Sequence, residues 1–231
     1  MNQYLLLLIC VVVSYLIGCI LFAMIITKIA TGKDIRKMGN TNPGASNVMR
    51  NVGPVAGVLT TILDIAKALV PIIIARIFFF KGDTFFDWIS LYLIGMAAIL
   101  GHCRPFWNGF KKGGGGMGSA VGVCAFFVPF EFAIALLIGV FIAFTFMKKA
   151  EFKFGRWSVA FAALVNPFVV LLLGKLVNIP LFWHFSIGGH NDGVIVGAFL
   201  LLVELFLLNS YELFHWLKNP KDKKNPERKN A

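Results

Sequence analysis

The sequence predicts an all-α membrane protein: a bundle of seven transmembrane helices with the N-terminus outside and the C-terminus in the cytoplasm. Three observations support this prediction. Of the 231 residues, 58% are hydrophobic and only 14% are charged, whereas a soluble domain is about half apolar and about a quarter charged. Long apolar runs alternate with short polar loops. The basic residues gather in alternate loops, as they do on the cytoplasmic side of membrane proteins.

The apolar runs define the helices, because a spanning helix needs about 20 mainly apolar residues. Residues 117–147 are too many for one helix, and Pro129 divides them, since proline removes a helical hydrogen bond. Glu131, just after it, is expected to face water. The expected helices are 4–27, 54–80, 88–101 (beginning as early as Phe85), 117–128, 132–147, 157–177 and 193–216.

The positive charge gives the bundle its orientation. Most of the 22 Lys and Arg residues fall in loops 28–50, 102–116 and 148–156 and in the C-terminal tail, so these segments are expected to be cytoplasmic. A net charge of +11 confined to such loops does not indicate nucleic-acid binding. We expect one transmembrane domain, residues 1–220, and a basic, disordered tail, residues 221–231, near anionic lipid.

The cysteines do not predict a metal site or a disulfide framework. Their positions show no C-x-x-C spacing and no histidine partner at ligand spacing. We expect them to be small apolar packing residues. These are Cys10, Cys19, Cys103 and Cys124.

Residues 39–50, here called the asparagine loop, are the first candidate for binding an anion. Small residues and asparagines allow positive φ angles, and consecutive backbone N–H groups form an anion-binding nest. Arg50 can bind a phosphate with two parallel hydrogen bonds. The alternative is an ordinary turn before a helix. The expected phosphate-binding residues are Asn42, Gly44, Asn47 and Arg50.

Residues 111–116, here called the glycine loop, are the second candidate. Four successive glycines let the backbone approach a ligand closely, and the positive end of the following helix favours an anion. The spacing is not that of a P-loop, because no lysine precedes Ser119. The alternative is a flexible linker. The expected phosphate-binding residues are Lys111, Lys112, Gly113 and Gly114.

Several charged residues lie within the apolar runs, and Asp64, Lys67 and Glu204 are the ones expected at membrane depth. Asp64 and Lys67 are three positions apart and share a helix face, which indicates a supporting ion pair. Charges at membrane depth usually face the protein interior and have a partner. For Glu204 the expected partner is Lys67. Taken alone, the residues predict a site for a phosphorylated, lipid-adjacent ligand at the inner face.

The order of the motifs resembles that of the integral-membrane acyl-phosphate:glycerol-3-phosphate acyltransferases (PlsY-type) of bacteria. The resemblance in motifs covers residues 14–124. The matching segments are Tyr15–Ile20 (family Y-L-x-G-S-I), Asn42–Arg50 (N-x-G-A-T-N-x-x-R), Asp64–Lys67 (D-x-x-K), Gly101–Pro105 (G-H-x-x-P), and Phe110 with Lys112–Gly114 (F-K-G-G, with Lys111 as an insertion).

The resemblance implies a seven-helix bundle in the bacterial inner membrane with its active site on the cytoplasmic face. It implies transfer of an acyl group from acyl phosphate to the 1-hydroxyl of glycerol 3-phosphate, which gives lysophosphatidic acid for phospholipid synthesis. No metal or prosthetic group is implied. In the catalytic site, Ser46, His102 and Ser119 would orient the ligand or the loop.

The chain departs from the family pattern at two places. Gly115 stands where the family has a second lysine, and the final H-x-x-N-I-x-R motif is not recognisable around Ser210, Leu213 and Trp216. Three functions therefore stay open. The chain is a membrane acyltransferase, or a catalytically impaired relative that binds phospholipid precursors or protein partners. The third is a small-anion transporter, suggested by the buried Asp64, Lys67 and Glu204.

Overall fold

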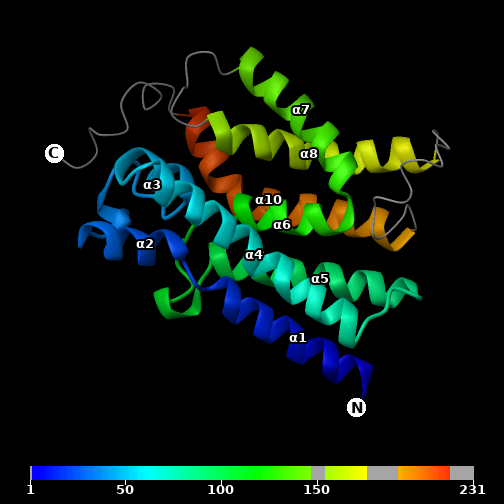
Figure 1. Ribbon diagram of the computed structural model, residues 1–231. Coiled ribbons are helices and arrows are strands. Elements are labelled where there is room, and N and C mark those ends of the chain that lie inside the picture. Colours follow the sequence, from blue (N-terminus) through cyan, green and yellow to red (C-terminus); the bar gives the residue numbers. More distant parts are fainter. Residues whose placement is uncertain (1, 147–153, 176–191, 219–231) are drawn as a thin grey trace.

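The computed structural model describes residues 2–146, 154–175 and 192–218, and the elements within these ranges are helices (Figure 1). Two are short 3-10 helices, η1 (Ile35–Lys37) and η2 (Phe106–Asn108). The others are α1 (Gln3–Gly18), α2 (Phe22–Thr31), α3 (Ala45–Asn51), α4 (Pro54–Phe78), α5 (Phe85–Cys103), α6 (Met117–Phe127), α7 (Pro129–Phe146), α8 (Phe154–Lys175) and α10 (Asp192–Lys218).

The apolar runs do form the helices, and the division near Pro129 is confirmed. α6 ends at Phe127 and α7 begins at Pro129, where the missing N–H of proline costs nothing because a first-turn N–H has no helical partner. The expectation that Glu131 faces water is wrong, since its residue is only 2% exposed. Glu131 lies in the first turn of α7, where the positive end of the helix stabilises a carboxylate.

The first apolar run is two helices, not the single helix expected over residues 4–27. α1 ends at Gly18 and α2 begins at Phe22. The break leaves two backbone carbonyls outside the helical ladder, and distant side chains bind both. The indole Nε1 of Trp107 donates to Cys19 O at 2.9 Å, and Lys67 Nζ donates to Ile20 O at 2.9 Å. The bend therefore depends on residues far along the chain.

Among the described residues, four segments are long and apolar enough to cross a membrane: Gln3–Thr31, Pro54–Phe78, Phe85–Asn108 and Asp192–Asn209. Three shorter apolar helices are Met117–Phe127, Pro129–Thr145 and Ser158–Leu173. These segments coincide with the seven expected runs, while their crossing and direction stay predictions. The expected tail, 221–231, and most of loop 148–156 lie outside the described residues.

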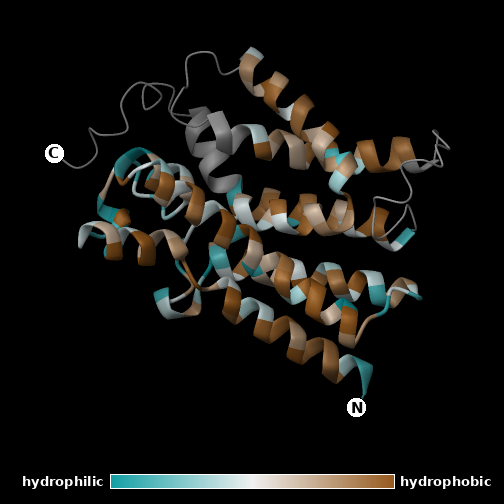
Figure 2. Ribbon diagram, viewed as in Figure 1, coloured by the Kyte–Doolittle hydropathy of each residue, from teal (hydrophilic) through white to brown (hydrophobic). Residues whose placement is uncertain are grey.

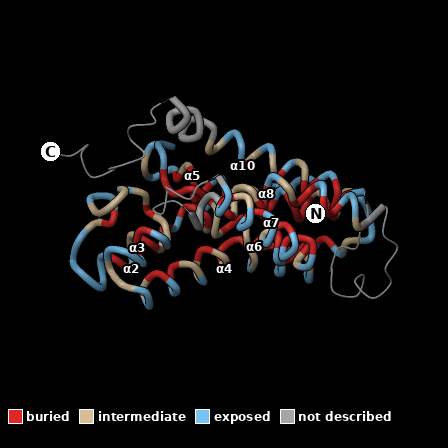
Figure 3. Tube along the Cα trace, turned by 90° about the horizontal axis from the view of Figure 1, so that it is seen from above, coloured by how far each residue is buried: buried red, intermediate tan, exposed pale blue. Residues whose placement is uncertain are grey.

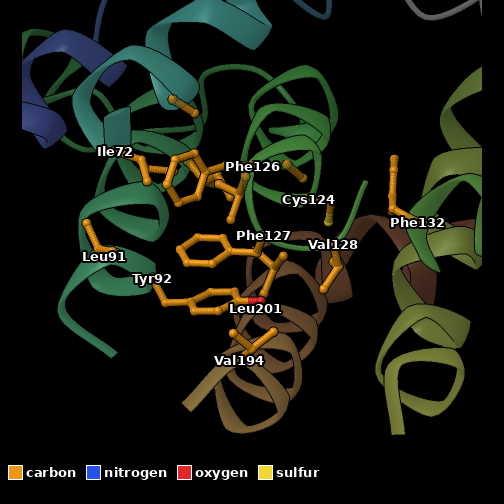
Figure 4. Packing of buried hydrophobic residues seen from close by; sticks show 14 of the residues in the cluster. Ile72, Leu91, Tyr92, Cys124, Phe126, Phe127, Val128, Phe132, Val194 and Leu201 are labelled. Atoms are coloured by element: carbon orange, nitrogen blue, oxygen red, sulfur yellow. The ribbon is translucent and has the colours of Figure 1, made fainter. Parts of the chain in front are cut away.

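The core lies where α5, α6 and α10 meet (Figure 4). Tyr92 of α5 stacks on Phe127 of α6, with ring centroids 3.7 Å apart and planes inclined by 11°. The other face of Tyr92 lies against Gly197 of α10, where a Cβ atom would collide with the ring. Small residues allow such close approach between helices in membrane proteins, so one buried ring joins three helices.

The elements are distributed unequally along the bundle. Figures 1 and 3 both place α2 and α3 at the end opposite the N-terminus. Figure 3 shows buried residues along the middle of the bundle, and Figure 2 shows apolar helices there with hydrophilic segments around α3. α1 lies along α5, α4 along α6, and α7 against α8. A ligand-binding site is therefore expected at the polar end of the bundle, which carries α2 and α3.

Candidate functional site

The asparagine loop is organised by the side chain of Asn47, which is only 1% exposed. Its Nδ2 lies 3.3, 2.9 and 3.1 Å from the carbonyl oxygens of Ile35, Met38 and Asn42. Its Oδ1 accepts from Asn51 Nδ2 at 2.8 Å. Asn47 was expected to bind phosphate, but its polar atoms are occupied by the protein. Its side chain fixes the loop against η1 and the end of α3, and phosphate binding by Asn47 stays a prediction.

The backbone of the asparagine loop also binds to itself. The Gly44 N–H donates to Asn42 O at 2.9 Å, and the Asn47 N–H donates to Gly44 O at 2.9 Å. The Asn42 N–H donates to Asn40 Oδ1 at 3.2 Å. The nest expected from consecutive N–H groups is therefore largely used internally. Gly44 ends the turn as the residue before α3 and offers no free amide to an anion.

The outward face of α3 carries Ser46 and Arg50, which are both exposed. Four residues apart on a helix, they lie on the same face, while Asn47 and Val48 point inward. Partial burial lowers the pKa of the Arg50 guanidinium from its ordinary value. Partial desolvation strengthens a charged contact because the effective dielectric constant falls. This face is the exposed part of the first motif.

Asn42, also in this loop, has a side-chain hydrogen-bond acceptor without a donor in the described part of the chain. Its Oδ1 is buried, and none of the described residues donates a hydrogen bond to it. A buried acceptor without a donor costs free energy. A ligand hydroxyl or ammonium group would supply the missing donor, whereas a phosphate oxygen would not.

The glycine loop is attached to the end of α5. The Gly113 N–H donates to Cys103 O at 2.8 Å, and the Gly114 N–H donates to His102 O at 3.0 Å. The last carbonyls of a helix lack helical partners, so these bonds complete α5. The amides of Gly113 and Gly114 are therefore used within the protein, and phosphate binding by these two glycines stays a prediction.

Lys111 and Lys112 lie before these glycines, and both are exposed. The turn that carries them begins at η2, where the Phe110 N–H donates to Pro105 O at 3.2 Å. Phe110 has a φ of 57°, a left-handed conformation that is uncommon for a bulky residue. Asn108 Nδ2 reaches Lys112 O at 3.4 Å. The turn thus holds two cations next to the start of α6.

A buried cluster of charged and polar residues lies beneath the glycine loop. Lys67 Nζ is 2.9 Å from Asp64 Oδ1 and 2.5 Å from His102 Nδ1. The three residues are each 3% exposed, and Asp64 and Lys67 form the expected ion pair. The imidazole of His102 lies against Gly114, where a Cβ atom would collide with Nε2. The cluster therefore joins α4 and α5 to the loop.

Ser119 contacts this cluster from α6. Its Oγ donates to the backbone oxygen of Asp64 at 3.1 Å, and the residue is fully buried. The neighbouring Gly118 lies against Asp64 Cβ, which a Cβ atom at position 118 would approach to 2.9 Å. Ser119, expected to orient ligand or loop, is placed to hold the loop and the start of α6 on α4.

Sequence reasoning missed Asn209 of α10. Its Nδ2 lies 3.3 Å from Gly115 O and 2.9 Å from Leu205 O. This bond fastens α10 to the glycine that replaces the family's second lysine. A polar side chain one turn after Glu204 in an apolar run was the available signal, but nothing in the sequence indicated its partner.

The expected contact between Glu204 and Lys67 is wrong, because Lys67 is paired with Asp64. Glu204 instead lines an open, mainly apolar groove of about 460 Å³, formed largely by α1 residues such as Tyr4 and α5 residues such as Leu100. Its Oε2 has no hydrogen-bond partner among the described residues. Glu204 therefore lies apart from the Asp64–Lys67 pair, and the three residues do not form one cluster of charges.

Comparison with known proteins identifies the lineage of this arrangement. A family model described as glycerol-3-phosphate acyltransferase matches residues 8–212. The chain belongs to the glycerol-3-phosphate acyltransferase family. A family member from Desulfotalea psychrophila is 33% identical over 83% of this chain and 85% of its own length. One from Lactobacillus johnsonii is 43% identical over 57% of this chain and 61% of its own length.

The matches to the first curated relatives thus span about three fifths of the length of those proteins. Solved structures extend the likeness. A crystal structure of PlsY, an integral membrane glycerol 3-phosphate acyltransferase, in its glycerol 3-phosphate form has a TM-score of 0.68 and 26% identity. It covers 92% of both chains. The lysophosphatidic acid form has a TM-score of 0.65 and 25% identity. The fold is that of an integral membrane protein.

Proposed function

We propose that this protein transfers an acyl group from acyl phosphate to the 1-hydroxyl of glycerol 3-phosphate, giving lysophosphatidic acid for phospholipid synthesis. The reaction takes place at the inner face of the bacterial cytoplasmic membrane, where the basic loops 28–50 and 102–116 lie. Residues 1–220 form the transmembrane domain, and the basic tail 221–231 meets anionic lipid. Family membership and the location of the two loops support the proposal.

The single observation that carries it is the outward face of α3. Ser46 and Arg50 are exposed there, while Asn47 fixes the loop behind them through three carbonyl contacts. Such a preorganised cation stabilises a phosphate without reorganisation at the moment of reaction. Lys111 and Lys112 supply further positive charge from the second loop. Two dianionic substrates repel one another, so cations on both loops lower the cost of bringing them together.

The chemistry needs little from the protein beyond this alignment. The 1-hydroxyl oxygen of glycerol 3-phosphate attacks the acyl carbonyl carbon, and a new ester C–O bond forms. The bond between that carbon and the phosphate oxygen breaks. The phosphate leaves with the electron pair and accepts the hydroxyl proton. The products are lysophosphatidic acid and inorganic phosphate, and no metal or prosthetic group takes part.

The residues divide into those that contact substrate and those that hold the loops. Arg50, with Lys111 and Lys112, binds phosphate, and Ser46 orients it. Asn42, which lies in the same loop and is partly exposed, binds substrate beside them. A second group holds the loops in place from behind: Gly44, Asn47, Asp64, Lys67, His102, Gly113, Gly114 and Ser119.

The test uses the purified protein in liposomes, supplied with acyl phosphate and glycerol 3-phosphate, with lysophosphatidic acid measured as product. Arg50→Ala is expected to lower kcat/KM by about 10- to 150-fold, since a charged hydrogen bond contributes about 1.5–3 kcal/mol. The matched control is Arg36→Ala. That arginine is near the same loop but is ion-paired with Asp34 at 2.7 Å and has a side chain 41% exposed, so near-normal activity is expected.

The same preparation separates the alternatives. Saturable binding of glycerol 3-phosphate that needs Arg50, without product, would identify a catalytically impaired relative. Gly115 in place of the family's lysine is the observation that favours this second candidate. Counterflow of labelled glycerol 3-phosphate without a new ester would identify a transporter. Equal loss of activity in Arg36→Ala and Arg50→Ala would contradict the assignment of the α3 face.

A further inference from the structure

Lys67 makes three polar contacts at once, and each goes to a different part of the fold. Its Nζ lies 2.9 Å from Asp64 Oδ1 on its own helix and 2.9 Å from Ile20 O at the break between α1 and α2. The third contact is to His102 Nδ1 on α5, at 2.5 Å. An ammonium group can only donate hydrogen bonds, so Ile20 O and His102 Nδ1 are its acceptors, while the contact with Asp64 is an ion pair.

These contacts specify the state of the His102 ring. An ammonium on Lys67 forms the ion pair with Asp64 Oδ1 at 2.9 Å, and an ammonium can only donate to Nδ1. A ring nitrogen that accepts a hydrogen bond carries no proton. His102 is therefore neutral, with its single N–H at Nε2. Asp64 Oδ1 is 3.6 Å from Nδ1, too far to accept a proton from it in a normal hydrogen bond.

The Nε2 edge of the ring faces the glycine loop. The three atoms nearest to a Cβ built on Gly114 are Nε2, Cδ2 and Cε1 of His102, so the imidazole fills the space behind that glycine. The Gly114 N–H is also bonded to His102 O at 3.0 Å. Side chain and backbone of one histidine thus support the same residue of the loop, and the orientation of the ring affects where the loop lies.

We propose that Lys67 is a positioning residue for the glycine loop. It fixes His102 as the tautomer with its proton on Nε2 and keeps the Nε2 edge of the ring against Gly114. Lys67 does not touch the substrate. It joins the break after α1, the middle of α4 and the end of α5 at one point, and the imidazole transmits that placement to the loop. The inference deepens the proposed function and rests on it for its kinetic test, but its tautomer test needs no activity.

The first experiment measures the tautomer by ¹⁵N NMR of histidine-labelled protein in detergent micelles. Protonated and unprotonated ring nitrogens resonate far apart, and the chain has four histidines, so the signals lost in His102→Gln identify His102. The wild type is expected to carry its proton at Nε2. Lys67→Met is expected to give a mixture of tautomers. A proton at Nδ1 in the wild type, or an unchanged tautomer in Lys67→Met, would overturn the proposal.

The second experiment measures kinetics in liposomes. Lys67→Met leaves Asp64 as a lone buried charge, which is strongly destabilising, so the double variant Asp64→Asn with Lys67→Met is made as well. If Lys67 positions the loop, the double variant folds and its KM for glycerol 3-phosphate rises about tenfold. A lower kcat with unchanged KM would indicate only a smaller folded fraction and would contradict positioning.

A matched pair at position 102 tests the direction of the effect. His102→Asn keeps an acceptor near Nδ1 for Lys67 but empties the space behind Gly114. His102→Gln places an amide N–H near Nε2 and fills that space. The proposal predicts a higher KM for His102→Asn than for His102→Gln, and the reverse order would overturn it.

If the wild type makes no product, the dissociation constants of glycerol 3-phosphate are compared in place of the KM values. Absence of both activity and binding would count against the proposed function, while the tautomer result still decides on Lys67.

Discussion

The asparagine loop and the glycine loop lie at the same end of the bundle but are held in different ways. The asparagine loop is held by one of its own side chains, because Asn47 binds the carbonyl of Asn42 in the loop and those of Ile35 and Met38 just before it. The glycine loop is held from outside, by the carbonyls at the end of α5, by His102 and by Asn209 of α10. One loop therefore carries its own support, whereas the other takes its shape from the bundle.

The comparison predicts that a single substitution inside the asparagine loop is enough to disrupt its structure. Asn47→Ala leaves three carbonyls without their donor, and an unsatisfied buried group costs about 1–3 kcal/mol. We expect the largest effect of all: a fall of about 2–5 kcal/mol in stability and loss of glycerol 3-phosphate binding, measured by thermal unfolding and equilibrium dialysis. Asn51→Ala, which removes one donor to Asn47 Oδ1, is the control and should cost much less. Equal losses would show that Asn47 is not the centre of the loop.

The structure of the glycine loop should instead depend on its contacts with neighbouring parts of the bundle. Gly114→Ala forces the new methyl group against His102, and overpacking a filled site costs about 1–3 kcal/mol. We expect a raised KM for glycerol 3-phosphate. Adding His102→Ala removes the obstacle, so the double variant should recover part of the loss, as a double-mutant cycle would measure. Simple additivity of the two changes would mean that the ring and the glycine do not interact.

A smaller effect is expected where α10 holds the same loop. Asn209→Leu removes the bond to Gly115 O and keeps a side chain of similar size, and a neutral hydrogen bond contributes about 1 kcal/mol. KM for glycerol 3-phosphate should rise several-fold, with little change in the unfolding temperature. The control is Leu208→Ala, a neighbouring change in packing that leaves the bond intact. A rise in KM only in Leu208→Ala would argue that packing of α10, and not this bond, sets the loop.

The smallest effect should come from an exposed contact before the asparagine loop. Arg36 holds the pKa of the Asp34 carboxyl below its ordinary value, chiefly through their hydrogen bond. Because the pKa of Asp34 is lower in the folded state, its charge stabilises the folded protein at pH values above the unfolded pKa of about 3.9. This stabilisation is lost as the pH falls through the folded pKa. The unfolding temperature of the wild type should exceed that of Asp34→Asn slightly at pH 7 and match it in acid. Such pairs contribute under about 1 kcal/mol, so a large difference at pH 7 would assign the pair a structural role.

Much of the fold could be predicted because membrane helices need long apolar runs, and those runs are visible in the sequence. The break after Gly18 was not predictable, since residues 4–27 are apolar throughout and the groups that stabilise it, Lys67 and Trp107, come later in the chain. Glu131 was misjudged for a related reason. Its polarity suggested water, whereas it lies on the face of α7 that is buried, together with Phe132 and Ala135.

The sequence predicted which residues belong to the candidate site more accurately than what each residue does there. Arg50 and Ser46 are exposed, as a ligand-facing pair should be, and helical spacing alone places them on one face. The residue types of Asn47 and Gly114 suggested ligand contact, but both are occupied by the protein. Whether an amide faces a ligand or a neighbouring carbonyl depends on tertiary packing, which the sequence does not display.

The bend between α1 and α2 has a consequence for biogenesis. In lipid, a backbone carbonyl without a partner costs several kcal/mol, so the bend is tolerated only while Trp107 and Lys67 bind Cys19 O and Ile20 O. Both partners come later in the chain, Lys67 on α4 and Trp107 in η2. The bend can therefore be stabilised only after those segments have been synthesised and have packed against the first one.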